Sequence, residues 1–138
     1  MMRPNKGNKR VRLKGKILVV DDMGFILTAL EMLLSREGYD VSTACSYFGA
    51  MEKMTRIDFN LVLTDIDLGD KTGIDVMKEV RKKDLSCPVI LHTAAPNIKA
   101  ETEARRMGAY DYLSKPIERE ILLQSVRTAL SRKTVPIL

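Results

Sequence analysis

The chain has 138 residues, of which 45% are hydrophobic and 30% charged, a composition typical of a single globular domain. No apolar run approaches the roughly 20 residues that a membrane-spanning helix needs, and the basic N-terminus lacks the apolar centre of a secretory signal. These features exclude a membrane protein and predict a cytoplasmic one, in which Cys45 and Cys87 are expected to stay thiols.

The positive charge is concentrated at the N-terminus. Residues 1–16 contain seven Lys or Arg and no acid, whereas the rest of the chain contains 16 Lys or Arg and 18 Asp or Glu. A basic arm can bind nucleic acid, but this one has no aromatic residue for base stacking and no folded reader beside it. We therefore predict a disordered basic tail over residues 1–15 and do not expect nucleic acid as a partner.

The first half of the chain alternates short apolar runs with segments of helical periodicity. Strands are predicted at residues 17–20 (ILVV) and 40–44 (DVSTA), and the second, being less apolar, suits a sheet edge. A helix over residues 23–37 lies between them and stops at Gly38. Four of its residues are expected to face the core: Ile26, Ala29, Leu30 and Leu33.

The next helix is predicted to begin at Ser46, a good capping residue, and to run to about Arg56 with Ala50 and Met54 inward. Three further strands are expected at residues 59–64, 88–92 and 109–113. Helices follow each of them, the first opening at Thr72 or Gly73, the others over residues 97–107 and 117–131. The residues expected to face the core in these three helices are Ile74, Val76, Met77 and Val80, then Ile98, Ala104 and Met107, then Ile121, Leu122, Val126 and Leu130.

This alternation predicts an α/β fold with a parallel sheet. Right-handed crossovers place helices on both faces of such a sheet, which gives a three-layer sandwich. Neither an internal repeat nor a second domain is visible. We therefore assign residues 16–131 to one domain and residues 132–138 to a short C-terminal tail.

Polar residues follow four of the strands directly: the pair Asp21-Asp22, then Asp65, Thr93 and Lys115. Since ligands collect at the carboxyl ends of parallel strands, these side chains should meet at one rim. Carboxylate oxygens suit Mg²⁺, and an ammonium suits a phosphoryl group. Two simpler interpretations remain open: Asp22 could cap the first helix, and Lys115 could be an exposed lysine before a helix-starting proline.

Four motifs together resemble a receiver domain of the bacterial two-component response regulators. They are ILVVDD at 17–22, LVLTDIDLGDKTGIDV at 61–76, HTA at 92–94 and GAYDYLSKP at 108–116. The resemblance implies a flavodoxin-like, five-stranded parallel sheet in the order 2-1-3-4-5. It also implies a phosphorylation-dependent signalling switch, similar to the stand-alone chemotaxis-type receivers.

By this resemblance, Asp65 is the phosphoacceptor, and a histidine kinase or a histidine phosphotransfer protein is the donor. Asp21 and Asp22 resemble the acidic pair that binds Mg²⁺ together with Asp65, and the backbone carbonyl of Asp67 would be a further ligand. One departure is visible at residues 68–69, where Leu-Gly stands in place of the family's frequent Met-Pro.

The resemblance also gives roles to the residues of the later strands. Lys115 would pair with the phosphoryl group, Thr93 would be the switch hydroxyl, and Tyr112 would be the aromatic switch. The response would reach a downstream protein at the face formed by the fourth helix, the fifth strand and the fifth helix.

Two other functions fit parts of this sequence. LVLTDIDLG also resembles the first motif of haloacid-dehalogenase-type phosphatases, but in that family the nucleophile strand precedes the acidic pair, and here it follows. A DNA-binding regulator would need a reader, and no helix-turn-helix segment follows residue 131. We therefore expect a switch that acts through protein contacts and catalyses only its own phosphorylation and dephosphorylation.

Overall fold

The computed structural model describes residues 13–134. Its centre is a parallel sheet of five strands in the order β2-β1-β3-β4-β5, as predicted. The strands are β1 (Lys16–Val20), β2 (Asp40–Ala44), β3 (Leu61–Asp65), β4 (Val89–Thr93) and β5 (Asp111–Ser114). The helices between and after them are α1 (Gly24–Arg36), α2 (Tyr47–Arg56), α3 (Gly73–Lys83), α4 (Ile98–Arg106) and α5 (Arg119–Thr134).

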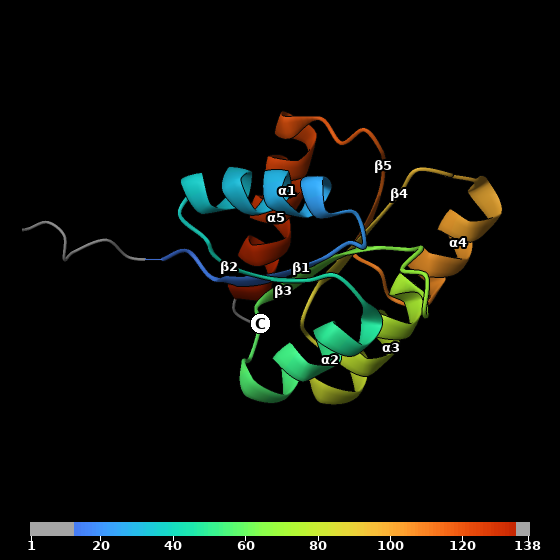
Figure 1. The fold of residues 1–138 in the computed structure, drawn as a ribbon, viewed down its shortest axis with the longest axis horizontal. Helices are drawn as coiled ribbons and strands as arrows, with labels where there is room; N and C mark the ends of the chain where they lie inside the picture. The colour runs from blue at the N-terminus through green and yellow to red at the C-terminus, as the bar shows by residue number, and fades with distance from the viewer. Residues whose placement is uncertain (1–12, 135–138) are drawn as a thin grey trace, which may run out of the picture.

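The helices cover both faces of the sheet and so complete the three predicted layers. Figure 1 shows α1 and α5 together on one side of the sheet and α2 and α3 on the other. Because side chains alternate along a strand, Leu18 and Val20 of β1 enter the core under α2 and α3, whereas Ile17 and Val19 enter the core under α1 and α5. Burial of both faces explains why the strands are almost continuously apolar.

Local signals in the sequence fix several helix starts. The Ser46 hydroxyl accepts a hydrogen bond from the Gly49 amide at the start of α2. Thr72 and Asp75 form a reciprocal capping box at the start of α3. Each cap satisfies amides of the first helical turn that have no partner within the helix.

The predicted inward faces of three helices need correction. Ala29 is exposed and Leu34 is fully buried in α1. Ile98 is 82% exposed and Ile121 51% exposed, so neither faces the core. Ile98 is the first residue of α4, just after its cap, and Ile121 lies in the first turn of α5. Spacing alone shows that a helix has an apolar stripe, but the rotation of the helix on the sheet decides which of two adjacent apolar residues is covered.

The described residues reach slightly beyond two of the predicted boundaries, while the division into one domain and two tails stays a prediction. Residues 1–12 of the predicted tail lie outside the described residues. Within the predicted tail, the Lys14 amide donates to the Gly38 carbonyl, and the Gly15 carbonyl accepts from the Asp40 amide. At the other end, α5 continues to Thr134 rather than ending at residue 131.

Candidate functional site

The polar residues that follow the strands lie at one rim of the sheet. Asp65 is the last residue of β3 and Thr93 the last of β4, while Asp21 follows β1 and Lys115 follows β5. Asp21, Asp22 and Asp65 each offer a carboxylate oxygen, and these oxygens lie within 4.8 Å of one another. The topology therefore brings the predicted site residues together, and their chemical roles stay predictions.

The Lys115 ammonium bridges two buried carboxylates. Its Nζ donates to Oδ2 of Asp21 at 2.9 Å and to Oδ2 of Asp65 at 3.1 Å. The peptide bond between Lys115 and Pro116 is cis. Only 12% of the Lys115 side chain is exposed, so this residue is not the exposed lysine of the simpler interpretation.

Burial controls the ionisation of this pair. Removal from water raises the pKa of the Asp65 carboxyl above its ordinary value, and the hydrogen bond and charge of Lys115 offset this only in part. Burial acts to lower the pKa of Lys115, but its hydrogen bonds to Asp21 and Asp65 outweigh that effect, and the pKa is raised. Lys115 therefore remains a cation at neutral pH and holds two like charges close together.

Backbone contacts fix the directions of the acids. The Met23 amide donates to Oδ1 of Asp21 at 2.9 Å, and the Asp67 amide donates to Oδ1 of Asp65 at 3.3 Å. The N-cap of α1 is Met23, and no side chain caps this helix. Asp22 is therefore not the helix cap, which leaves its exposed carboxylate available at the rim.

This donor set fits a hard divalent cation. Three carboxylates, two of them buried, converge without a neutralising partner other than Lys115 among the residues described. Mg²⁺ prefers oxygen ligands, commonly one or two carboxylates with waters and phosphate oxygens. The exposed position of Asp22 leaves one side of the cluster open to such a ligand.

Thr93 and Tyr112 lie on the neighbouring strands β4 and β5. The Thr93 hydroxyl accepts a hydrogen bond from the Ala95 amide at 3.1 Å, and the Thr93 carbonyl accepts one from the Lys115 amide at 2.8 Å. Tyr112 is buried in the core under α2 and α3, and its hydroxyl has no hydrogen-bond partner among the described residues.

His92 is a feature that the sequence reasoning did not single out. It pairs in register with Asp65, and its side chain is fully buried with Nδ1 3.8 Å from Oδ2 of Asp21. The pKa of His92 is lowered to about 4, chiefly by burial and also by the charge of Lys115, while the charge of Asp21 opposes the change. The imidazole is therefore neutral at neutral pH. The signal in the sequence was a polar residue inside an otherwise apolar strand, VILH.

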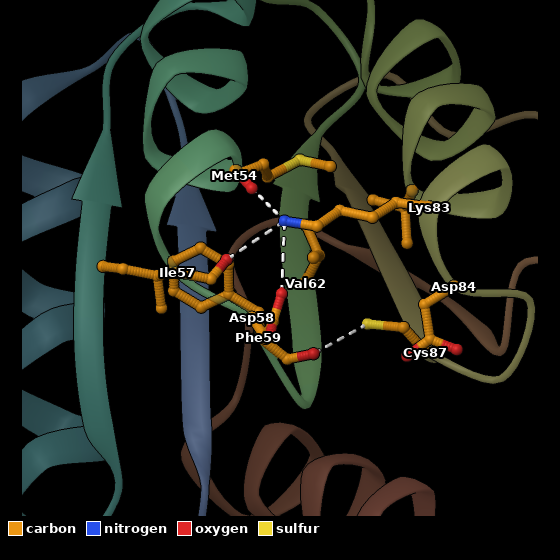
Figure 2. Close-up of a pocket in the computed structure, with 9 residues that line it drawn as sticks. Met54, Ile57, Asp58, Phe59, Val62, Lys83, Asp84 and Cys87 are labelled. Carbon is orange, nitrogen blue, oxygen red and sulfur yellow. Dashed lines mark hydrogen bonds and ion pairs between the residues drawn. The ribbon is translucent and has the colours of Figure 1, made fainter.

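A cavity of about 320 Å³ lies at the opposite end of the sheet, between α2 and α3. Figure 2 shows Lys83 reaching across it to the carbonyls of Met54 and Ile57 at the end of α2. The Cys87 thiol donates to the Phe59 carbonyl at 3.5 Å. The residues before β3 and β4 line this cavity, so it is separate from the acidic rim at the carboxyl ends of the strands.

None of the helices in the described part of the chain has the length and apolar character required to cross a membrane.

Comparison with known proteins gives one consistent result. Residues 17–127 match the family model of the response regulator receiver domain. Among curated proteins, the transcriptional regulatory protein YkoG of Bacillus subtilis is 37% identical over 117 residues, which are 85% of this chain and 51% of YkoG. ZraR of Salmonella typhimurium is 35% identical over 121 residues, which are 88% of this chain and 27% of ZraR. The chain thus spans about half of the first relative and about a quarter of the second.

Solved structures agree with the sequence matches. A response regulator receiver domain protein from Clostridium thermocellum superposes with a TM-score of 0.81 at 31% identity, over 86% of this chain and 95% of that one. A CheY-like receiver domain protein from Methanospirillum hungatei gives 0.83 at 30% identity, over 88% and 97% of the two chains.

Proposed function

The chain belongs to the response regulator receiver domain family, and we propose that Asp65 is the residue that accepts the phosphoryl group. The observation that carries the proposal is the position of Lys115, whose ammonium contacts Asp65 and Asp21 at the carboxyl ends of central strands. Asp65 is 5% exposed and is the last residue of β3, at the rim of the sheet. A nucleophile in this place would meet a donor at that rim.

The proposed reaction is a phosphoryl transfer from a phosphohistidine. A carboxylate oxygen of Asp65 attacks phosphorus, the phosphorus–nitrogen bond breaks, and the imidazole of the donor protein leaves with the electron pair. The product is an acyl phosphate. Because the transition state is loose, the residues around Asp65 contribute chiefly by positioning and by neutralising charge on the phosphoryl oxygens. Lys115 supplies one positive charge beside the reacting carboxylate.

Asp21, Asp22 and Asp65 would hold Mg²⁺, and the backbone carbonyl of Asp67 would be a further ligand. When bound, the cation would supply positive charge to the phosphoryl oxygens and reduce the repulsion between the three carboxylates. The Met23 and Asp67 amides orient two of these carboxylates before any ligand arrives. This preorganisation supports the assignment of the acidic cluster as the cation site.

Phosphorylation would reach a partner protein through the face formed by α4, β5 and α5. Thr93 would move toward the new phosphoryl oxygens, and its carbonyl already accepts a hydrogen bond from the Lys115 amide. Tyr112, on the neighbouring strand, would respond to this movement. Ile98 and Ile121, expected in the core, are instead exposed on α4 and α5. Apolar residues exposed on these helices would suit contact with a protein.

We propose the cytoplasm as the compartment. Neither Cys45 nor Cys87 forms a disulfide, which fits a reducing environment. The curated relatives named above are transcriptional regulators, and a role in transcription for this chain would run through whichever protein its phosphorylated face contacts.

Incubation with acetyl phosphate and Mg²⁺, followed by intact-protein mass spectrometry, tests the proposal. We expect one phosphoryl group on the parent chain and none on Asp65→Asn. Release of many phosphates per chain from a small phosphodonor would favour the phosphatase alternative instead. Salt-dependent DNA binding that disappears on removal of residues 1–16 would add a nucleic-acid partner that this proposal does not include.

A further inference from the structure

The imidazole of His92 is a buried polar group that the proposed chemistry does not use. Its side chain is 0% exposed, and neither Nδ1 nor Nε2 has a hydrogen-bond partner in the described part of the chain. Buried polar atoms without a partner are uncommon, because each has lost its hydrogen bond to water. The neighbouring residues of β4, Ile90 and Leu91, are apolar and fully buried. An apolar residue at position 92 would serve packing equally well without this cost.

His92 faces the acid that the Lys115 ammonium now holds. Nδ1 lies 3.8 Å from Oδ2 of Asp21, which is beyond hydrogen-bond distance. That oxygen accepts from Lys115, while the other oxygen of Asp21 accepts from the Met23 amide. In the resting protein both oxygens of this fully buried carboxylate are therefore satisfied without the imidazole.

Phosphorylation would change this arrangement. The acyl phosphate on Asp65 would place new negative charge beside Lys115, whose Nζ is already 3.1 Å from an Asp65 oxygen. As the ammonium turns to the phosphoryl oxygens, Oδ2 of Asp21, whose side chain is 0% exposed, loses a charged donor. A buried carboxylate oxygen that loses its donor is unfavourable.

We propose that His92 is a positioning residue for Asp21. The Nδ1–H of His92 donates to Oδ2 of Asp21 when Lys115 moves to the phosphoryl group. The proposal rests on the phosphorylation of Asp65. A shift of about 1 Å would bring the two atoms to hydrogen-bond distance. A neutral imidazole has one N–H, and the bond that it makes decides which nitrogen carries the hydrogen. His92 would thus keep Asp21 aimed at the cation in the phosphorylated state.

A matched pair of variants separates this hydrogen bond from packing. Leu and Asn have nearly the same shape, and the amide nitrogen of Asn takes the place of Nδ1. With Mg²⁺ titrated during labelling by acetyl phosphate, His92→Leu should need about tenfold more Mg²⁺ for half-maximal phosphorylation. His92→Asn should stay within about twofold of the parent. Equal behaviour of the two variants would overturn the proposal.

A second measurement needs no variant. Nitrogen-15 NMR of the imidazole in the full parent chain reports which ring nitrogen carries the hydrogen. Mg²⁺ with beryllofluoride, a phosphoryl mimic, should produce a hydrogen-bonded Nδ1–H signal that the untreated protein lacks. If the ring keeps both its original tautomer and its original chemical shifts, the proposed role of His92 is contradicted. If the parent chain takes up neither phosphoryl nor beryllofluoride, the proposed phosphorylation of Asp65 is rejected, and the role of His92, which rests on it, is rejected as well.

Discussion

Gly73 lies against the backbone of Asp65 so closely that no side chain fits between them. A Cβ atom on Gly73 would lie 2.3 Å from the Asp65 carbonyl oxygen, and the Gly73 amide donates to the Ile66 carbonyl at 2.7 Å. The start of α3 is thus packed directly onto the end of β3. Glycine is required here for close approach of two backbones rather than for an unusual φ.

Gly73→Ala should therefore destabilise the protein by about 1–3 kcal/mol, as overpacked sites do. The displaced backbone carries Asp65, so labelling by acetyl phosphate should slow as well. Chemical denaturation and the rate of labelling measure the two effects. Gly24→Ala is the matched control, because nothing lies within 4 Å of a Cβ on Gly24, the first residue of α1. Unchanged stability and labelling in Gly73→Ala would show that the loop after β3 adapts freely.

Asp65→Asn should stabilise the resting protein at neutral pH. The pKa of Asp65 is raised by burial, so its ionised form is disfavoured in the folded state. An acid whose pKa is raised in the folded state lowers the free energy of unfolding at pH values above that pKa. This effect disappears as the pH falls to the pKa that the acid has in the unfolded chain. The gain in the free energy of unfolding that Asp65→Asn gives over the parent should therefore shrink as the pH falls through the folded pKa towards the ordinary value of 3.8.

Denaturation curves in the absence of Mg²⁺ at neutral and acidic pH measure this advantage. Asp58→Asn serves as a control, since its side chain is 97% exposed and the change should have little effect at any pH. An advantage of Asp65→Asn that grows on acidification would have the wrong sign and would reject the explanation.

Asp22→Ala should weaken Mg²⁺ binding by at least about tenfold, which is the loss seen even for outer-shell partners of metal ligands. The carboxylate lies within 4.8 Å of those of Asp21 and Asp65 and does not cap α1. Mg²⁺ titration followed by NMR or fluorescence gives the affinity, with Asp58→Ala as a control for loss of an exposed acid. Parent-like affinity in Asp22→Ala would remove this residue from the cation site.

Thr93→Ala should still accept a phosphoryl group but lose the response at Tyr112. The mutation leaves Asp65 and Lys115 in place and removes the γ-methyl together with the hydroxyl that now accepts from the Ala95 amide. Thr93→Ser keeps the hydroxyl and should keep the response. The chemical shifts of the Tyr112 ring, compared before and after phosphorylation, report the coupling. Identical shift changes in Thr93→Ala and the parent would contradict it.

Short-range patterns predicted the alternation of strands and helices, the three layers and the helix starts near Ser46 and Thr72, whereas the strand order was implied by the resemblance to receiver domains. Apolar runs mark the buried strands, and Ser46 and Thr72 mark helix starts by their own hydroxyl chemistry. The rotation of each helix depends on packing against the sheet, which a single sequence does not encode locally. Ala29, Ile98 and Ile121 were therefore assigned to the core wrongly, and the burial of Leu34 was not predicted.

In the site, too, short-range patterns predicted some features, and others depend on how distant residues pack together. The position of each acid after a strand predicted its place at the rim. The bridge from Lys115 to Asp21 joins residues 94 positions apart, so only the sheet order could suggest it. The unsatisfied ring of His92 was not foreseeable, because it depends on which atoms surround a buried strand residue in three dimensions.

The identity of the phosphorylated residue is the central claim, and borohydride reduction tests it most directly. An aspartyl phosphate is reduced to homoserine, which marks the modified position permanently. After treatment with acetyl phosphate and Mg²⁺, peptide mass spectrometry should find homoserine at position 65 alone and none when Mg²⁺ is withheld. Homoserine at Asp21, Asp22 or Asp67, or none at any position, would contradict the account.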